Sequence, residues 1–314
     1  MASLNIVVAF FVSVVALSQL IRWISKKLLP ARIYRCTVSE LVSSLQLCAC
    51  CMELRMLVEI GMWGGGYGPD VVSTLLFLLF VAHGFTFDGA SANSAVSLQE
   101  FLLKDCPFID SVFKLASQYA GMEAARFLTK RYWKLELTQF HLIQSMMSED
   151  CSSSLQTTLA QGIFVEALCA FCYHLVLLRF QNTRLLYKVP TTALTVTLLT
   201  YAGSPFTSAY FNPVLAYILT FDCSGNTLRE YAIVYFGGSL AGMVLALLIY
   251  QGNIPQLFQK NLLYSQKSKF RMPKSKTVQP KASSNAPSSP KGTEKKSETR
   301  QRKTASVPSK GKSS

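Results

Sequence analysis

Two segments decide the fold: HGFTFDGASANSAV at residues 83–96 and YAGSPFTSAYFNPV at residues 201–214. Each segment follows a long apolar run, passes through a bend of small residues and reaches an asparagine, Asn93 or Asn212, that opens a shorter apolar stretch. Asparagine is a favoured helix N-cap, and Pro213 suits a first helical position because its missing N–H would have no helical partner there. The pattern therefore predicts two helices that begin at these asparagines.

The predicted short helices cover residues 94–103 and 213–221. With a rise of ~1.5 Å per residue, each crosses about half of a bilayer. If they enter from opposite faces, their positive ends point at one place, where cations and protons meet an electrostatic barrier. We expect the asparagine NH₂ groups to donate to a permeating molecule; the alternative is that both residues only cap re-entrant loops.

The composition excludes an ordinary soluble domain. Of the 314 residues 50% are hydrophobic and 15% are charged, and the mean hydropathy is +0.28, which leaves too little polar surface for a soluble fold. Long apolar runs predict helices that cross the ~30 Å hydrocarbon layer. These runs are residues 4–24, 38–60, 71–87, 108–128, 159–180, 190–207 and 228–250. The first run lacks a basic start and is expected to be an uncleaved anchor.

The six runs after the first divide into two halves of similar layout. Glu40 precedes Asn93 by 53 positions, and Glu166 precedes Asn212 by 46 positions. Three spans in each half give the halves opposite orientations, the arrangement in which broken helices meet at the membrane midplane. The expected parts are therefore an anchor and linker (1–36), two repeats (37–157 and 158–252) and a basic tail (253–314).

This layout resembles the aquaporin family, whose signature is a pair of Asn-Pro-Ala boxes on half helices. The boxes here, Asn93-Ser94-Ala95 and Asn212-Pro213-Val214, are similar to those of the unorthodox branch called superaquaporins, and stretches such as DGASAN and VSLQEFL are similar to a single member of it. The resemblance covers about residues 38–252. It implies an all-α membrane protein: a right-handed bundle of six transmembrane helices and two re-entrant half helices in an inverted repeat, here with an extra N-terminal hydrophobic helix.

The resemblance also implies roles for single residues. Asn93 and Asn212 match the pore asparagines, while Glu40 and Glu166 match buried glutamates that brace the re-entrant loops; snorkelling to the interface and proton handling are the alternatives. The resemblance makes three residues candidates for the selectivity filter: Leu215, where the family usually places an arginine, Thr200 and Ala209. We also expect Ser94 to loosen the first box and Val214 to widen or shift the packing between the half helices. The single histidines His83 and His174 are interpreted as structural.

The cysteines predict neither a metal site nor a cofactor. The chain has nine, including Cys48, Cys50 and Cys51, but no paired C-x-x-C set with a nearby histidine. Basic segments are expected to face the cytosol, which puts Cys151 and Cys223 on the opposite side, where oxidation is allowed. We therefore predict a disulfide between these two. Signatures of common enzymes are missing, so no enzyme is expected.

The tail is strongly basic, with 15 Lys and Arg against two Glu in residues 251–314. Contact with anionic cytosolic lipid is favoured over nucleic-acid binding, and the tail is expected to be disordered. Lys310 and Lys312 match the K-x-K-x-x signal that returns proteins to the endoplasmic reticulum, so an intracellular membrane and a cytosolic C-terminus are expected.

These features together predict passive flow of water or a small neutral solute such as glycerol or hydrogen peroxide. The resemblance adds a homotetramer with one pore in each protomer. Two alternatives stay open: a structural or regulatory protein whose pore Val214 and the altered first box close, and a coupled transporter in which Glu40 or Glu166 titrates.

Overall fold

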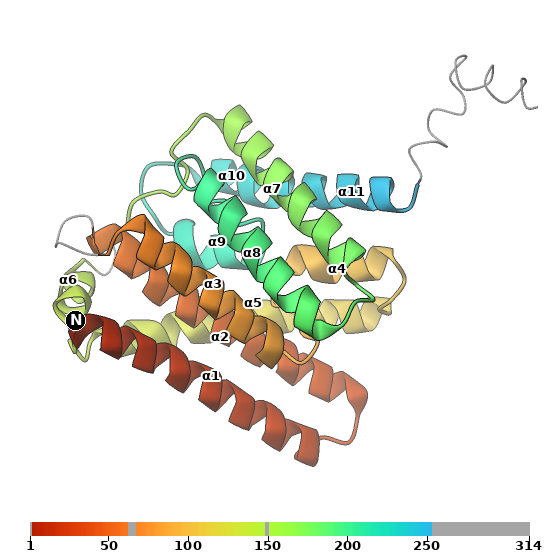
Figure 1. The fold of residues 1–314 in the computed structure, drawn as a ribbon, viewed down its shortest axis with the longest axis horizontal. Helices are drawn as coiled ribbons and strands as arrows, with labels where there is room; N and C mark the ends of the chain where they lie inside the picture. The colour runs from red at the N-terminus through yellow and green to blue at the C-terminus, as the bar shows by residue number, and fades with distance from the viewer. Residues whose placement is uncertain (1, 62–66, 148–150, 253–314) are drawn as a thin grey trace, which may run out of the picture. The chain divides into compact units, whose positions relative to one another are not determined.

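A computed structural model describes residues 2–61, 67–147 and 151–252, and its regular structure in these ranges is helical (Figure 1). The helices are α1 (Ala2–Leu28), α2 (Arg32–Gly61), α3 (Pro69–Thr86), α4 (Ser94–Leu102), α5 (Phe108–Trp133), α6 (Gln139–Met146), α7 (Leu159–Arg179), α8 (Leu185–Gly203), α9 (Pro213–Thr220), α10 (Leu228–Tyr231), the π-helical turn η1 (Ala232–Gly238) and α11 (Ser239–Tyr250).

Five helical segments in the described ranges are long and apolar enough to cross a membrane. They are Ser3–Leu28, Arg32–Ile60, Pro69–Thr86, Leu159–Arg179 and Leu228–Tyr250. This confirms the all-α membrane fold. The other two expected spans, α5 and α8, contain 26 and 19 residues and are long enough, but they are less apolar than the five.

Two of the charged residues that interrupt α5, Lys114 and Arg126, have ion-pair partners in the protein. Lys114 Nζ lies 2.6 Å from a carboxylate oxygen of Glu100, and Arg126 pairs with Asp222. An ion pair lowers the free energy of a charged side chain at membrane depth. The polar composition of α5 is therefore compatible with a place among the spanning helices.

The two repeats pack their helices in the same way, since α2 lies against α5 in the first and α7 against α11 in the second. Glycines allow these close approaches. A Cβ atom at Gly121 would lie 2.1 Å from the Leu41 carbonyl oxygen, and one at Gly242 would lie 2.1 Å from the Ala167 carbonyl oxygen. Small residues that bring two backbones into contact are typical of membrane helix pairs.

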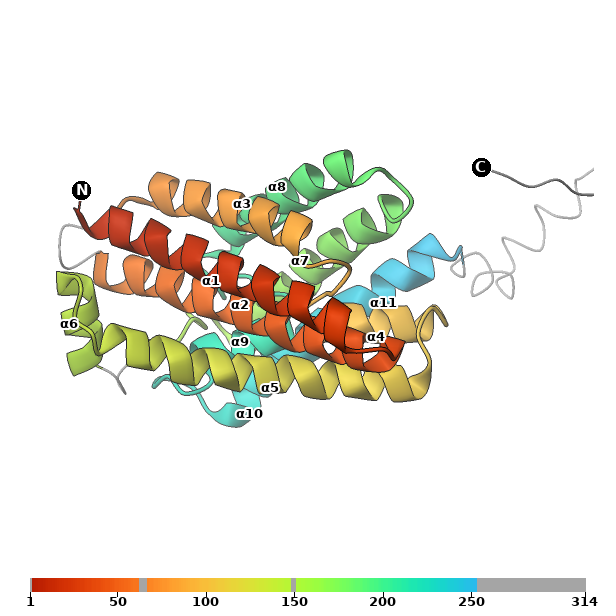
Figure 2. The same ribbon diagram turned by 90° about the horizontal axis from the view of Figure 1, so that it is seen from below.

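The two short helices lie among the long ones and contact each other. Helix α4 packs on α5 and α11, while α9 packs on α2 and α5, so each half helix touches the opposite repeat. Helix α1 runs alongside α2 and also contacts α3 (Figure 2). The N-terminal hydrophobic helix is therefore part of the packed helical assembly.

Several helix boundaries differ from the sequence analysis. Helix α1 continues to Leu28 rather than ending at Ile24, and α2 begins at Arg32 rather than at Val38. Helix α8 begins at Leu185 rather than at Pro190, so the proline lies inside the helix, and it ends at Gly203 before the turn that contains Pro205. Helix α5 continues to Trp133. Helix α6 was not predicted, because its eight residues are too few to give a clear periodic pattern.

We expect Gly242→Ala to destabilise the protein by about 1–3 kcal/mol, because the added methyl group must push α7 and α11 apart. The measurement is the midpoint of thermal unfolding in detergent. Gly237→Ala is the matched control, since a Cβ there meets nothing within 4 Å. A fall of the same size in both variants would contradict the close approach at Gly242.

Candidate functional site

The two short helices begin at Asn93 and Asn212. Asn93 caps α4, its side-chain oxygen accepting the Ala95 N–H at 2.9 Å, and Asn212 caps α9, accepting the Val214 N–H at 3.2 Å. Both asparagines have extended backbone conformations, as N-caps do. The two positive helix ends therefore carry the same cap.

Each asparagine side chain also donates a hydrogen bond to the backbone of the opposite repeat. Asn93 Nδ2 donates to the Phe211 carbonyl at 3.3 Å, and Asn212 Nδ2 donates to the Ala92 carbonyl at 2.9 Å. The bonds are reciprocal: each joins one asparagine to the residue that precedes the other. An amide NH₂ has two hydrogens. Among the described residues, Asn212 keeps one for a further acceptor, whereas Asn93 also hydrogen-bonds to the side chain of Tyr173, another residue of the cavity wall. The sequence did not reveal this crossing, since its partners are about 120 residues apart.

The backbone before each asparagine is strained. Ala92 has a φ of 49° and Phe211 a φ of 34°, and Ser208 and Ala209 also lie in the left-handed region, which costs non-glycine residues ~1–3 kcal/mol each. The carbonyls of the two residues that precede the asparagines are the acceptors of the crossing bonds. The strained conformations thus occur in the segments that carry the contact between repeats.

Glu40 binds the first re-entrant segment. Its two carboxylate oxygens accept the backbone N–H groups of Ser91 and Ala92, at 3.0 and 3.1 Å. Gln118 Nε2 donates to it at 2.9 Å, and Lys114 Nζ lies 4.0 Å away. Glu40 is completely buried. A buried carboxylate with several donors can replace its lost hydration, as it does here.

Glu166 has the equivalent position in the second repeat. One oxygen accepts the Thr207 hydroxyl at 2.8 Å and the Tyr210 N–H at 3.1 Å, and the other accepts the Phe211 N–H at 2.8 Å. This side chain is also completely buried. The geometry of both glutamates is that of braces for the re-entrant segments.

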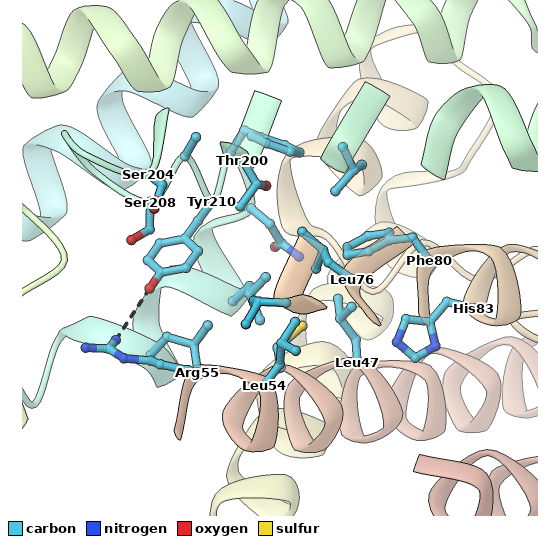
Figure 3. A pocket seen from close by; sticks show the side chains of 18 of the residues that line it. Leu47, Leu54, Arg55, Leu76, Phe80, His83, Thr200, Ser204, Ser208 and Tyr210 are labelled. Carbon is cyan, nitrogen blue, oxygen red and sulfur yellow. Dashed lines mark hydrogen bonds between the residues drawn. The ribbon is translucent and has the colours of Figure 1, made fainter. Parts of the chain in front are cut away.

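Both asparagines line one cavity of about 1630 Å³. The three filter candidates Thr200, Ala209 and Leu215 line the same cavity, and Figure 3 shows Thr200, Ser204 and Ser208 across from residues of α2. Most of the remaining wall is apolar, with Leu47, Leu54 and Leu76 among its residues. A few polar groups in an apolar wall are typical of sites for small neutral molecules.

The box residues that follow the two asparagines lie outside this wall. Of the described residues that line the cavity, none is Ser94, Ala95, Pro213 or Val214. Val214 is completely buried and packs in a hydrophobic cluster with residues of α2 and α5. Its two extra methyl groups therefore contact the core and do not narrow the cavity.

A disulfide joins Cys151 to Cys223. It links the segment that precedes α7 to the residue three positions after α9, and the Ser224 N–H donates to the Cys151 carbonyl at 3.2 Å. Cys48, Cys50 and Cys51 are buried in α2. Lys310 and Lys312 lie outside the described residues.

Both single histidines make buried hydrogen bonds to glutamine. Gln46 lies 2.9 Å from His83 Nδ1, and Gln99 Oε1 lies 2.5 Å from His174 Nδ1. His83 also lines the cavity. Each pair joins two different helices, which is what a structural histidine does.

Two buried polar groups had no counterpart in the sequence analysis. Arg22 of α1 is 2% exposed and donates to Ser43 and Gln46 of α2, both at 2.9 Å. Glu53 accepts bonds from Trp133 at 2.7 Å and is 2.9 Å from His141 Nε2. These networks attach α1 and α6 to α2; a single sequence does not show which distant residues form them.

Arg55 is a third residue that the sequence analysis missed. It lies on α2, lines the cavity and contacts Tyr210 of the second re-entrant segment (Figure 3). The only available signal was an arginine four residues before a glutamate in an apolar run.

Helices, braces and facing asparagines together define an aquaporin-like membrane protein. No family model matches the chain. An aquaporin-12 of Mus musculus is 52% identical over 276 residues, covering 88% of this chain and 95% of that protein. An aquaporin-11 of Homo sapiens is 30% identical over 251 residues, which cover 80% of this chain and 90% of that protein. An aquaporin-11 of Equus caballus is 31% identical over 226 residues, which cover 72% of this chain and 81% of that protein.

The chain belongs to the aquaporin family. It falls in the superaquaporin branch and is nearer to aquaporin-12 than to aquaporin-11, which confirms the resemblance stated from its boxes. It is accordingly a multi-pass membrane channel for water or small solutes, in a family of channels rather than enzymes.

We expect Glu166→Ala to lower the free energy of unfolding by about 2–4 kcal/mol, because three buried donors lose their acceptor. The measurement is thermal unfolding in detergent. Glu123→Ala is the control, since the Glu123 side chain is 55% exposed and its pair with Arg126 contributes little. Equal stability of the two variants would show that Glu166 does not brace the segment.

Proposed function

We propose that the cavity between the repeats conducts water and small neutral solutes, glycerol or hydrogen peroxide among them, down their gradients. The observation that carries this proposal is that Asn93 and Asn212 line one cavity while capping helices from opposite repeats. Asn212 has one N–H left for a passing oxygen, and both helix starts present positive ends to the cavity. A neutral hydrogen-bonding molecule is stabilised there, and a cation is repelled.

The proposed protomer has six spanning helices, two half helices and α1 as an additional span, in the four parts expected from the sequence. We propose that four protomers associate, each with its own pore, and that the N- and C-terminal basic segments face the cytosol. The disulfide then faces the opposite, oxidising side.

The cavity also bears on the two alternative functions. A closed scaffold was suggested by Val214, which packs away from the cavity. A coupled transporter needs a carboxylate in contact with water, whereas Glu40 and Glu166 are completely buried and hydrogen-bonded to backbone. The structure therefore favours a channel over both.

We expect Asn212→Asp to reduce water and glycerol flux by about tenfold or more. The new carboxylate faces the Ala92 carbonyl in place of an N–H donor and presents a negative charge to the cavity. Stopped-flow swelling of vesicles with reconstituted protein measures the flux. Asn182→Asp, at an exposed position between α7 and α8, is the charge-matched control. An unchanged rate in Asn212→Asp would remove this residue from the pore, and wild-type flux equal to that of empty vesicles would refute the channel.

We further propose that the protein resides in an intracellular membrane and that Lys310 and Lys312 direct it there. Replacing both lysines by serine is expected to move the protein to the cell surface, measured by surface biotinylation. Replacing Lys291 and Lys303 by serine removes the same charge without touching the signal. Surface exposure in both double variants, or in neither, would contradict retrieval by Lys310 and Lys312.

A further inference from the structure

The cavity lacks the usual cation of its family beside the second half helix. Leu215, the third residue after Asn212, is 7% exposed and presents an aliphatic side chain to the cavity wall. Thr200 and Ala209, the other filter candidates, are also uncharged. If this end of the cavity discriminates by charge, the charge must come from another element.

Arg55 of α2 provides a positive group in the wall of the same cavity, beside Tyr210 of the second re-entrant segment. Nε and Nη2 donate to one oxygen of Glu59 at 2.9 and 2.5 Å, and Nη2 also donates to the Ser152 carbonyl at 2.6 Å. Nη1 approaches the Tyr210 hydroxyl at 3.4 Å, as the dashed line in Figure 3 shows. Three separate segments of the chain thus fix the orientation of the guanidinium, whose side chain is 13% exposed.

These contacts leave donor capacity on one edge of the guanidinium. Of its five N–H groups, those on Nε and Nη2 have acceptors, while Nη1 has two hydrogens and only the long contact to Tyr210 among the described residues. Glu59 lies on the opposite edge and therefore neutralises the charge only in part. The positive, unsaturated edge faces Tyr210, which lines the cavity.

Tyr210 connects this cation to the re-entrant segment. Its backbone N–H donates to Glu166, and its hydroxyl lies 2.8 Å from Ser154 Oγ. The aromatic ring is thus held between the brace of the second repeat and the segment that follows Cys151. Arg55 and Tyr210 therefore form a pair of a charged and an aromatic side chain. Each of the two is held in place by hydrogen bonds to other residues.

We propose that Arg55 is a selectivity residue of this channel and supplies, from the first helix of the first repeat, the cation that Leu215 does not. It admits neutral solutes by offering an N–H on Nη1 and excludes monovalent cations by charge repulsion. The inference rests on the proposed channel function. The other cationic residue in the described cavity wall, Lys188, belongs to the first turn of α8, and the structure shows no hydrogen bond that holds it in place.

The test uses purified full-length protein in vesicles, with three probes: water, glycerol and methylammonium ion. Arg55→Met keeps an unbranched apolar stem and removes the charge, whereas Arg55→Lys keeps the charge. Arg126→Met is the matched control, because Arg126 is similarly buried at 19% side-chain exposure but lies outside the cavity wall. An intact Cys151–Cys223 disulfide and a single gel-filtration peak show that each variant is folded.

We expect Arg55→Met to raise methylammonium permeability at least about tenfold while water flux persists, and Arg55→Lys and Arg126→Met to stay near wild type. If wild type conducts water or glycerol and Arg55→Met still excludes methylammonium, Arg55 is not the selectivity residue and the channel function stands. If wild type conducts neither neutral probe, the channel function fails and the inference about Arg55 fails with it. If Arg55→Met does not fold, Arg55→Gln replaces it as the variant without the charge, and its methylammonium permeability is judged in the same way.

Discussion

Backbone that is not helical at membrane depth must find its hydrogen-bond partners inside the protein, because lipid supplies none. The two re-entrant segments meet this constraint with side chains from the opening helix of their own repeat. Glu40 accepts N–H groups before Asn93, and Glu166 accepts N–H groups before Asn212. The same bonds give the buried carboxylates hydrogen-bond donors. The carboxylate and the backbone N–H groups therefore offset each other's desolvation penalty. The half helices, the cavity and the placement of the asparagines all depend on these hydrogen bonds between the glutamates and the re-entrant backbone.

The braces also explain how strained residues persist at the site. Ala92 and Phe211 have positive φ angles, and each donates its N–H to a glutamate and offers its carbonyl to the opposite asparagine. Two bonds in addition to the surrounding packing hold each residue in a conformation that it would otherwise leave. The conformation in turn directs the carbonyl across the interface between repeats.

The sequence revealed the parts of the site that local chemistry determines. Asn-led helix starts, Pro213 at a first helical position and glutamates isolated in apolar runs are visible without any knowledge of tertiary structure. The crossing bonds were not visible, because their acceptors are backbone carbonyls in the other repeat. Arg22 lies near the end of the first apolar run, and the sequence did not show that it is buried against Ser43 and Gln46. Its position depends on how α1 docks, and a single sequence does not determine docking.

The crossing bonds end on main-chain oxygens, and this affects how the family can diversify. A carbonyl is present whatever side chain its residue carries, so changes at positions 94 and 214 leave both acceptors in place. The amide donors have no such freedom, because in these two bonds the donors are the side chains of Asn93 and Asn212. The boxes can therefore change at the positions beside the asparagines without losing either acceptor of the two bonds, which is consistent with the serine and the valine found here.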